Sequence, residues 1–332
     1  MKLLSIIGML PIMNKRIVAI GGGTGLATLL RGLKKERELD IVGVVTMMDD
    51  GGSSGRLRKE FGVLPPGDVR NCLLALSDKE DLLLELFNYR FPVRTTKPQV
   101  GGHSLGNLLM IALADILGGF NKAIAAISEI LSIRGKVLPV TLQTANLIAE
   151  LENGKVVVGE SKISQCGVPI KKLSITPKKV NYYLDVVENI KTSDMIVIGP
   201  GSLFTSLIPP LLFEDIVFAI KDSKAKKVFV CNIMTQPGET DNYTVSRHLE
   251  MIYRHCDYNF KFDYVIVNKS KFPKNVLVLY ERKKSFPVKI DVGKYGKFGE
   301  KIVYGNFIPD VSCGKYLRHN PEKLVKKVVS LL

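Results

Sequence analysis

Short runs of β-branched residues alternate with amphipathic stretches along most of this chain, and glycine-rich turns separate them. The first run, RIVAI at 16–20, precedes the turn GGGTG at 21–25, and LDIVGVVTMM at 39–48 is a second apolar run. A nearly continuous apolar run is typical of a strand that is covered on both faces. Strands that alternate with helices in this way favour an α/β fold with a doubly wound, mainly parallel, Rossmann-like sheet.

The sequence pattern changes at about residues 136–178, where strand-like stretches surround an Asn153-Gly154 pair. Asn-Gly is a strong signal for a tight hairpin turn, so we expect an antiparallel β excursion from the main sheet there. Residues 15–332 as a whole are expected to form a single α/β domain. Residues 1–14 contain an apolar stretch without a small-residue cleavage site, and we interpret them as an N-terminal extension outside the fold.

The net charge of +15 is the most unusual bulk property of the 332-residue chain. A basic surface attracts nucleic acids, acidic lipids and anionic metabolites. The lysines are spread in pairs rather than gathered in one arm, so we expect no nucleic-acid partner, although the charge alone leaves that hypothesis open. No apolar run reaches the roughly 20 residues of a membrane helix, and no membrane insertion is expected. The five cysteines form no CxxC pair, which indicates reduced thiols in a cytoplasmic protein.

The glycine turn at 21–25 follows a predicted strand and opens a predicted helix, and ligands bind at the carboxyl ends of strands in such sheets. The N–H groups at a helix N-terminus attract anions. The turn is not the dinucleotide motif G-x-G-x-x-G, because Leu26 takes the last glycine position. A tight strand–helix crossing that needs small residues is the alternative. The candidate ligand-binding residues are Gly22, Gly23, Thr24 and Gly25.

The stretch DDGGSSGRLR at 49–58 combines two acids, bare backbone, hydroxyl groups and arginines in one predicted loop. A carboxylate there suits a ribose hydroxyl or a metal-bound diphosphate, because Mg²⁺ is usually held by one or two carboxylates and phosphate oxygens. N–H groups, hydroxyls and guanidinium groups suit phosphate oxygens. A solvated Asp-Asp-Gly turn is the alternative. The candidates are Asp50, Gly51, Gly52, Ser53, Ser54 and Arg56.

Further motifs place polar residues beside glycine turns or helix starts. In PPGDVRN (65–71), Asp68 is either a helix N-cap or a ligand residue. GGHSLGN (101–107) and GPGSLFTS (199–206) each place polar side chains where a glycine turn enters a predicted helix. The sequence contains no visible nucleophile–base–acid set and no His/Cys metal cluster. The candidates are Asp68, Asn71, His103, Ser104, Asn107, Gly199, Gly201, Ser202 and Thr205.

Taken in order, GGGTGL, DDGGSSGRLR, PPGDVRN, GHSLGN, GPGSLFTS, CNIMTQPGETD and LRHN resemble the gluconeogenesis factor family. This is the bacterial branch of the superfamily that also contains 2-phospho-L-lactate transferase. The resemblance implies a cytoplasmic, Rossmann-like protein that binds UDP-N-acetylglucosamine or a related UDP-sugar. It also implies a role in envelope precursor supply and cell shape during growth on gluconeogenic carbon sources, with a partner enzyme of amino-sugar synthesis. A homo-oligomer is left open.

The same resemblance implies roles for individual residues. Asp50 and Asp68 match the acids that hold a divalent metal, such as Mg²⁺, and the donor diphosphate in the transferase branch. Arg318 and Tyr280 match residues that are linked to UDP-sugar binding, since a guanidinium can clamp a diphosphate and a phenol can contact uridine or sugar. The alternative function is a metal-dependent transferase that moves a phospholactyl group from a nucleotide-diphosphate donor onto a deazaflavin alcohol. The sequence does not decide whether any turnover occurs.

Overall fold

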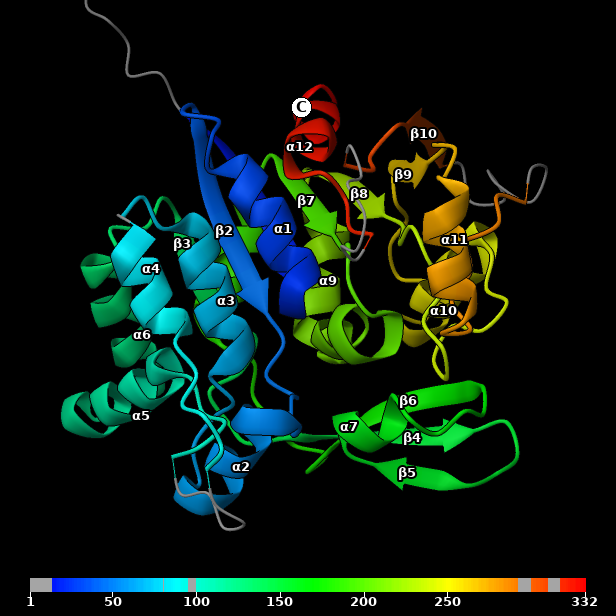
Figure 1. Cartoon of the computed structure of the whole chain (residues 1–332). Coiled ribbons are helices and arrows are strands. Elements are labelled where there is room, and N and C mark those ends of the chain that lie inside the picture. The colour runs from blue at the N-terminus through cyan, green and yellow to red at the C-terminus, as the bar shows by residue number, and fades with distance from the viewer. Residues whose placement is uncertain (1–13, 80, 95–99, 292–299, 310–316) are drawn as a thin grey trace, which may run out of the picture.

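A parallel sheet forms the centre of the molecule (Figure 1). The structure is a computed structural model that describes residues 14–79, 81–94, 100–291, 300–309 and 317–332. Within these ranges seven strands form one sheet in the order β10-β9-β8-β7-β1-β2-β3, and its pairings are parallel. The predicted doubly wound α/β sheet is confirmed. The strands are β1 (Lys15–Gly21), β2 (Leu39–Val45), β3 (Lys136–Pro139), β7 (Met195–Ile198), β8 (Lys226–Val230), β9 (Tyr264–Asn268) and β10 (Lys301–Gly305).

The strand order reverses beside β1. From β1 the chain continues to β2 and β3 on one side, and it returns to β7, β8, β9 and β10 on the other. Ile17 pairs with Ile41 of β2 and with Met195 of β7, so β1 lies between the two halves of the sheet. Such a reversal opens a crevice at the carboxyl ends of the two strands beside it, because their following segments leave toward opposite faces.

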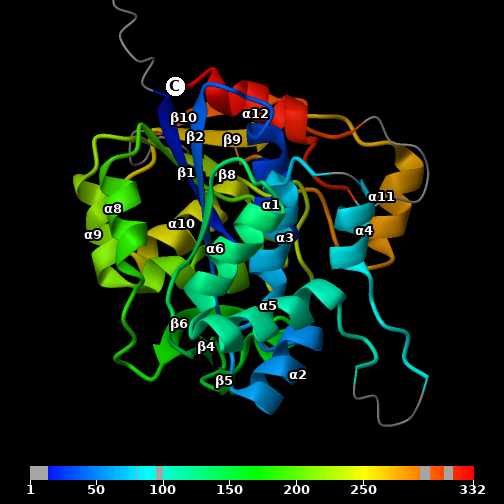
Figure 2. The same cartoon turned by 90° about the vertical axis from the view of Figure 1, so that its left-hand side faces the viewer.

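Helices cover both faces of the sheet (Figures 1 and 2). The helices α1, α3 and α12 lie on one face, and α8, α9 and α10 lie on the other. The α-helices of the main body are α1 (Gly23–Leu33), α2 (Gly52–Phe61), α3 (Gly67–Leu76), α4 (Asp81–Asn88), α5 (Leu105–Leu117), α6 (Phe120–Ile130), α8 (Leu184–Lys191), α9 (Glu214–Asp222), α10 (Val245–His255), α11 (Lys274–Glu281) and α12 (Pro321–Val329). A π-helix η1 (Leu203–Leu207) and a 3-10 helix η2 (Pro209–Leu212) follow β7.

The core forms where apolar helix stripes meet the sheet. In α1, Leu26, Leu29, Leu30 and Leu33 are fully buried, and their spacing places them on one helix face. Gly43 of β2 leaves room for that face, since a Cβ there would lie 2.9 Å from Leu30 Cδ1. Burial of each such side chain contributes about 1.5–3 kcal/mol relative to exposure. This packing fixes the N-terminus of α1 at the carboxyl edge of the sheet.

The antiparallel excursion is present but begins later than predicted. In the described part of the chain, β4 (Asn146–Leu151), β5 (Val156–Val158) and β6 (Ile170–Thr176) form a separate three-stranded sheet, with α7 (Glu160–Ile163) beside it. The predicted Asn153-Gly154 turn does join β4 to β5. Residues 136–139, which we assigned to the excursion, instead form β3 and pair in parallel with β2. The helices α2 to α6 lie between β2 and β3 in the chain and form the crossover that makes this pairing parallel.

The glycine–serine stretch at 51–55 is helical, whereas the sequence predicted a loop there. Helix α2 begins at Gly52, and Gly55 N donates to Gly51 O at 2.8 Å. A Cβ at Gly55 would lie 1.9 Å from Asp50 O, so the absent side chain permits this tight first turn. The phosphate-binding loop that we expected here is therefore the start of a helix.

Three sequence expectations concern the ends and the chemistry of the chain. The N-terminal extension at 1–14 falls almost entirely outside the described residues, which begin at residue 14. No described helix has both the length and the apolar character needed to cross a membrane. Cys72, Cys166, Cys231 and Cys256 are free thiols in the structure, and Cys313, the fifth cysteine of that prediction, lies outside the described residues.

We predict that Gly25→Ala destabilises the fold. A Cβ at Gly25 would lie 2.2 Å from Pro200 O, so the turns after β1 and β7 must move apart. Overpacking of this kind costs about 1–3 kcal/mol. Urea unfolding should show this loss of unfolding free energy. Gly21→Ala is the control, because its added Cβ would meet nothing closer than Leu207 Cδ2 at 3.4 Å, and it should lower the unfolding free energy much less. Equal stability of the two variants would contradict this account of the crossing.

Candidate functional site

A cavity of about 720 Å³ lies at the carboxyl ends of β1, β7 and β8, where the strand order reverses. Cavities of this size are typical for small-molecule ligands and cofactors. The turns that follow these three strands contribute to its lining, together with residues of α3, α7, α11 and the segment before α12. Segments from distant parts of the chain therefore meet at one place.

The turn after β1 brings the N-terminus of α1 to the cavity. Gly22 is the N-cap residue of α1 and has no side chain of its own with which to cap the helix. Asp68 contacts the turn directly, since its Oδ2 accepts a hydrogen bond from Gly23 N at 2.7 Å. The N-cap residue of α3 is Pro66, so Asp68 does not have the capping role that we considered. The helix dipole adds partial positive charge to this turn, which suits an anion.

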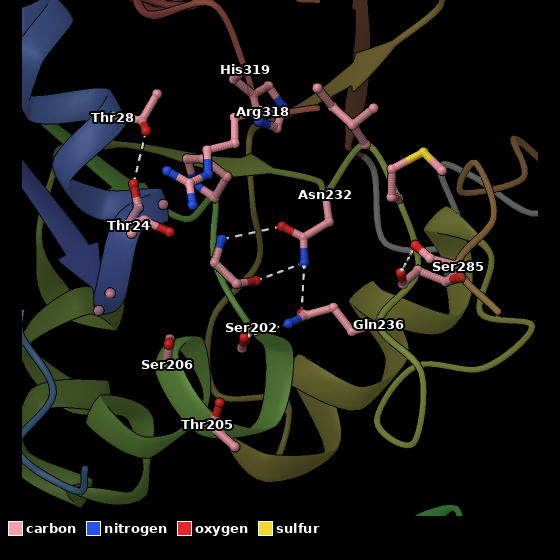
Figure 3. A pocket seen from close by; sticks show the side chains of 18 of the residues that line it. Thr24, Thr28, Ser202, Thr205, Ser206, Asn232, Gln236, Ser285, Arg318 and His319 are labelled. Atoms are coloured by element: carbon pink, nitrogen blue, oxygen red, sulfur yellow. Dashed lines mark hydrogen bonds between the residues drawn. The ribbon is translucent and has the colours of Figure 1, made fainter. Parts of the chain in front are cut away.

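The turn after β7 is held by side chains from the turn after β8 (Figure 3). The Asn232 carboxamide accepts a hydrogen bond from Gly201 N at 3.1 Å and donates one to Gly201 O at 2.7 Å. Gln236 Nε2 donates to Ser202 Oγ at 2.6 Å. After Ser202 the chain forms the π-helix η1, whereas the sequence predicted an α-helix start. Thr205 within it still lines the cavity.

Among the described residues, three carboxylates line the cavity: those of Asp49, Asp68 and Glu160. Burial, and secondly the charge of Asp49, raise the pKa of Asp68 to about 6. Burial, and secondly Asp49, also raise the pKa of Glu160 to about 7, against the opposing hydrogen bond with Thr205. Burial raises the pKa of Asp49 as well. The cavity therefore concentrates negative charge, which a bound cation or a proton would neutralise.

A further acid, Glu239, is buried behind the turn after β7. Its Oε1 accepts a hydrogen bond from Phe204 N at 2.8 Å. Burial raises the pKa of Glu239 to about 7, although its hydrogen bonds with the backbone N–H groups of Phe204 and Thr205 lower it. Glu239 thus holds the first residues of η1 in place and affects the stability of the cavity wall.

Arg318 and Tyr280, which the resemblance linked to UDP-sugar binding, both line the cavity. Tyr280 Oη accepts a hydrogen bond from Leu317 N, so the tyrosine holds the segment that carries Arg318. The next residue, His319, is buried, and burial lowers its pKa to about 4. His319 is therefore neutral at pH 7, and the positive charge of this segment comes from the exposed Arg318. Figure 3 shows Arg318 on the same side of the cavity as Thr24 and Thr28 of α1.

Ten of the predicted ligand-binding residues line this one cavity. They come from four separate sequence motifs and from α11. Ligand binding by them stays a prediction, but the shared location that the prediction required is present. These residues are Gly22, Gly23, Thr24, Gly25, Asp68, Gly201, Ser202, Thr205, Tyr280 and Arg318.

Most of the other predicted residues lie beside the cavity, in and around a polar network between α2, α3 and α5. Ser53 Oγ forms a hydrogen bond with His103 Nδ1 at 2.9 Å and accepts one from Asn107 Nδ2 at 3.1 Å. Arg56 donates to Gly101 O at 2.9 Å. These contacts join the start of α2 to the start of α5. The predicted residues that do not line the cavity are Asp50, Gly51, Gly52, Ser53, Ser54, Arg56, Asn71, His103, Ser104, Asn107 and Gly199.

Asp50, the predicted metal ligand, lies outside the cavity and docks the antiparallel excursion. Its Oδ1 accepts a hydrogen bond from Ser161 N of α7 at 2.8 Å. Gly159 approaches so closely that a Cβ there would lie 2.3 Å from Asp50 Oδ2. Of the two adjacent acids, Asp49 is the one that lines the cavity. A metal-binding role for Asp50 stays a prediction that this position does not support.

Asp49, Glu160, Asn232 and Gln236 were absent from the predicted set. Asn232 and Gln236 had a usable signal, because they are polar residues in the segment that follows the apolar run VFVC at 228–231. Glu160 had none, because it reaches the cavity only through the docking of α7 against Asp50.

The fold and the cavity together define a Rossmann-like protein with a cavity at the switch point of its sheet, where such folds bind ligands. A family model described as 2-phospho-L-lactate transferase CofD matches residues 17–308. The gluconeogenesis factor of Halalkalibacterium halodurans is 44% identical over 316 residues, which cover 95% of this chain and 96% of that protein. The gluconeogenesis factor of Bacillus subtilis is 41% identical over 317 residues, which cover 96% of this chain and 98% of that protein.

A solved structure agrees with these sequence matches. The crystal structure of a UPF0052 family member from Bacillus halodurans superposes with a TM-score of 0.90 at 44% identity, and the match covers 95% of this chain and 99% of that one. The chain belongs to the gluconeogenesis factor family, and its sequence also matches the 2-phospho-L-lactate transferase CofD family model.

The residues present fit a divalent cation only together with a ligand. Among the described residues, no group of three or more His, Cys, Asp or Glu side chains is arranged to hold a metal ion. Asp49 and Asp68, however, line the cavity near the glycine turn, and the charge of Asp49 raises the pKa of Asp68. Mg²⁺ is usually bound by one or two carboxylates with phosphate oxygens and waters, and this donor set matches that pattern.

We predict that Glu239→Gln removes part of the pH dependence of stability. The folded state raises the pKa of Glu239 from 4.5 to about 7, so it binds the proton more tightly than the unfolded chain does. Its stabilising contribution is full below about pH 4.5 and is lost as pH rises toward 7, by about 3 kcal/mol. The melting temperature of wild type should therefore fall over that pH range by more than the melting temperature of Glu239→Gln does.

The exposed Glu214 provides the matched control, and Glu214→Gln should retain the wild-type pH dependence. An unchanged pH dependence in Glu239→Gln would show that the buried carboxyl does not titrate in this range.

Proposed function

We propose that this protein binds a UDP-sugar, UDP-N-acetylglucosamine or a close relative, in the cavity at the switch point. The observation that carries this proposal is the convergence of two glycine turns and Arg318 on one cavity of about 720 Å³. Backbone approach, helix-terminal charge and a guanidinium are the features that a diphosphate requires. The chain belongs to the gluconeogenesis factor family, and the UDP-sugar is the ligand class that the resemblance to this family implied.

The diphosphate is proposed to lie against the turn after β1. Gly22 and Gly23 allow close approach, and because the Asp68 carboxylate already accepts the Gly23 N–H, a phosphate oxygen would use the other free N–H groups at the N-terminus of α1. Arg318 supplies a full positive charge from the segment before α12, with donors in the fork geometry that suits two phosphate oxygens. Loss of either group should weaken binding of any nucleoside diphosphate.

The nucleoside and sugar are proposed to use the neutral polar lining. Ser202, Gln236 and Ser285 line the cavity near the turns after β7 and β8. Hydroxyl and amide groups can both donate and accept, so they suit a uracil edge or sugar hydroxyls. Tyr280 offers an aromatic ring beside Arg318 that can pack on either part of the ligand.

The carboxylates make the binding dependent on a cation. A nucleoside diphosphate brings negative charge to a cavity that already holds Asp49, Asp68 and Glu160. A divalent ion between the diphosphate and the Asp49–Asp68 pair removes this repulsion. Mg²⁺ would supply charge neutralisation and ligand orientation there.

In cells, we propose that the protein is a cytoplasmic regulator that responds to the UDP-sugar concentration. By this proposal the liganded form acts on a partner enzyme of amino-sugar synthesis and so adjusts envelope precursor supply and cell shape during growth on gluconeogenic carbon. The names of the relatives support the link to gluconeogenesis. The described cavity lining contains no cysteine, and its histidine, His319, is buried and neutral, which favours binding over nucleophilic catalysis.

A metal-dependent transferase is the second candidate, because the matching family model carries that name. The cavity residues that bind a diphosphate would also hold a nucleotide-activated phospholactate. Incubation with such a donor, a deazaflavin alcohol and Mg²⁺ separates the two functions. Product formation that is lost in Asp68→Asn would favour the transferase, whereas tight UDP-sugar binding without product would favour the regulator.

We predict that Arg318→Ala weakens UDP-N-acetylglucosamine binding by about 10-fold or more, because a charge-assisted pair with phosphate is lost. Isothermal titration calorimetry measures the change directly. Arg282→Ala, at an exposed position of the C-cap of α11 outside the cavity, should bind as wild type does. Equal affinity of Arg318→Ala and wild type would show that the Arg318 guanidinium does not contact the ligand.

We also predict that Asp68→Asn abolishes the effect of Mg²⁺ on UDP-sugar affinity. The asparagine oxygen can still accept the hydrogen bond from Gly23 N, so the turn after β1 should persist. Asp50→Asn should keep the Mg²⁺ response, since Asp50 bonds to Ser161 outside the cavity. The opposite pattern, with the response lost only in Asp50→Asn, would restore Asp50 as the metal ligand.

A further inference from the structure

A smaller cavity of about 110 Å³ adjoins the main one, and we call it the side bay. It lies between α1, α3, the end of α4 and the segment before α12. The two cavities share Thr24, Thr28 and Arg318 in their linings. Of these two cavities, only the side bay is lined by Arg31, Asn71 and Asn88. Its volume is far below that of a nucleotide site and suits one small group.

The side bay is positively charged. Arg31 and Arg318 both line it, and among the described residues neither forms an ion pair. Burial is the largest cause that lowers the pKa of Lys34, and the positive charge of Arg31 lowers it further. Both arginines are exposed, so a group that enters from solvent or from the main cavity can reach them.

The neutral lining of the side bay also includes a hydrogen-bond donor. Asn71 Oδ1 accepts a hydrogen bond from Arg70 Nη2 at 2.9 Å, which leaves the Asn71 amide N–H groups for donation. Asn71 was predicted from its motif to bind a ligand, yet it lies outside the main cavity. Two guanidinium groups with an amide donor form a set that binds oxyanions.

We propose that the side bay is a second anion subsite that binds a phosphate or carboxylate group. The proposal rests on the proposed function, because Arg318 is shared with the UDP-sugar cavity. The anion is either a free small anion or an acidic group on the ligand of the main cavity. In both cases Arg318 holds the diphosphate from one side and the second anion from the other, and Arg31 acts on the second anion alone.

Calorimetry on wild type and Arg31→Gln with three probes tests the subsite: inorganic phosphate, UDP-N-acetylglucosamine, and UDP-glucuronic acid as a carboxylate-bearing UDP-sugar. We expect UDP-N-acetylglucosamine to bind both proteins equally. If the anion is free, phosphate affinity falls about 10-fold in Arg31→Gln; if it belongs to the ligand, UDP-glucuronic acid affinity falls by that factor. Either loss supports the proposal.

Two further variants guard this test. Arg37→Gln, at an exposed arginine outside both cavities, should leave all three affinities unchanged. Asn71→Asp keeps an acceptor for Arg70 but adds a negative charge to the side bay, so it should weaken the same anion that Arg31→Gln weakens. Unchanged phosphate and UDP-glucuronic acid binding in both bay variants would overturn the proposal, as would an equal loss for every probe. If wild type binds no UDP-sugar, the proposed function fails, while the phosphate measurement still tests the bay.

Discussion

The close approach of two turns at the switch point determines the rest of the site. Gly25 of α1 lies against Pro200 in the turn after β7, where no Cβ fits. This contact sets the distance between the N-terminus of α1 and the Gly201–Ser202 segment. Asn232, in the turn after β8, holds that segment through two hydrogen bonds to Gly201. The cavity therefore depends on main-chain packing between β1 and β7, which the buried leucines of α1 maintain.

Charge is the second constraint on the site. The cavity contains Asp49, Asp68 and Glu160, and burial raises the pKa of each. These acids oppose the anion that the glycine turns and Arg318 attract, so the site is complete only when a cation or protons accompany the ligand. This opposition explains why a cavity with phosphate-binding features is not simply basic. For the regulator that we propose, the same opposition would favour a metal-bound nucleotide sugar over other phosphates.

Local patterns predicted the parts of the structure that local interactions determine. The apolar run at 16–20 lies in β1, the run at 39–48 contains β2, which ends at Val45, and the Asn153-Gly154 turn joins β4 to β5. The predicted glycine turn at 21–25 is shorter than expected, because α1 already begins at Gly23. The predictions failed where tertiary contacts decide. The helical start of α2 depends on Gly55 packing against Asp50 O, and the choice of Asp49 over Asp50 depends on α7, which Asp50 holds at Ser161. Glu160 enters the cavity through that same long-range contact, which no local pattern reveals.

Amide hydrogen exchange with and without UDP-N-acetylglucosamine and Mg²⁺ tests the central claim most directly, because it reports the backbone of both turns at once. A ligand bound at the switch point should slow exchange at residues 22–26 and at residues 201–207 together. Protection at neither turn, or protection confined to the separate cavity between β6, α9 and α10, would contradict the account.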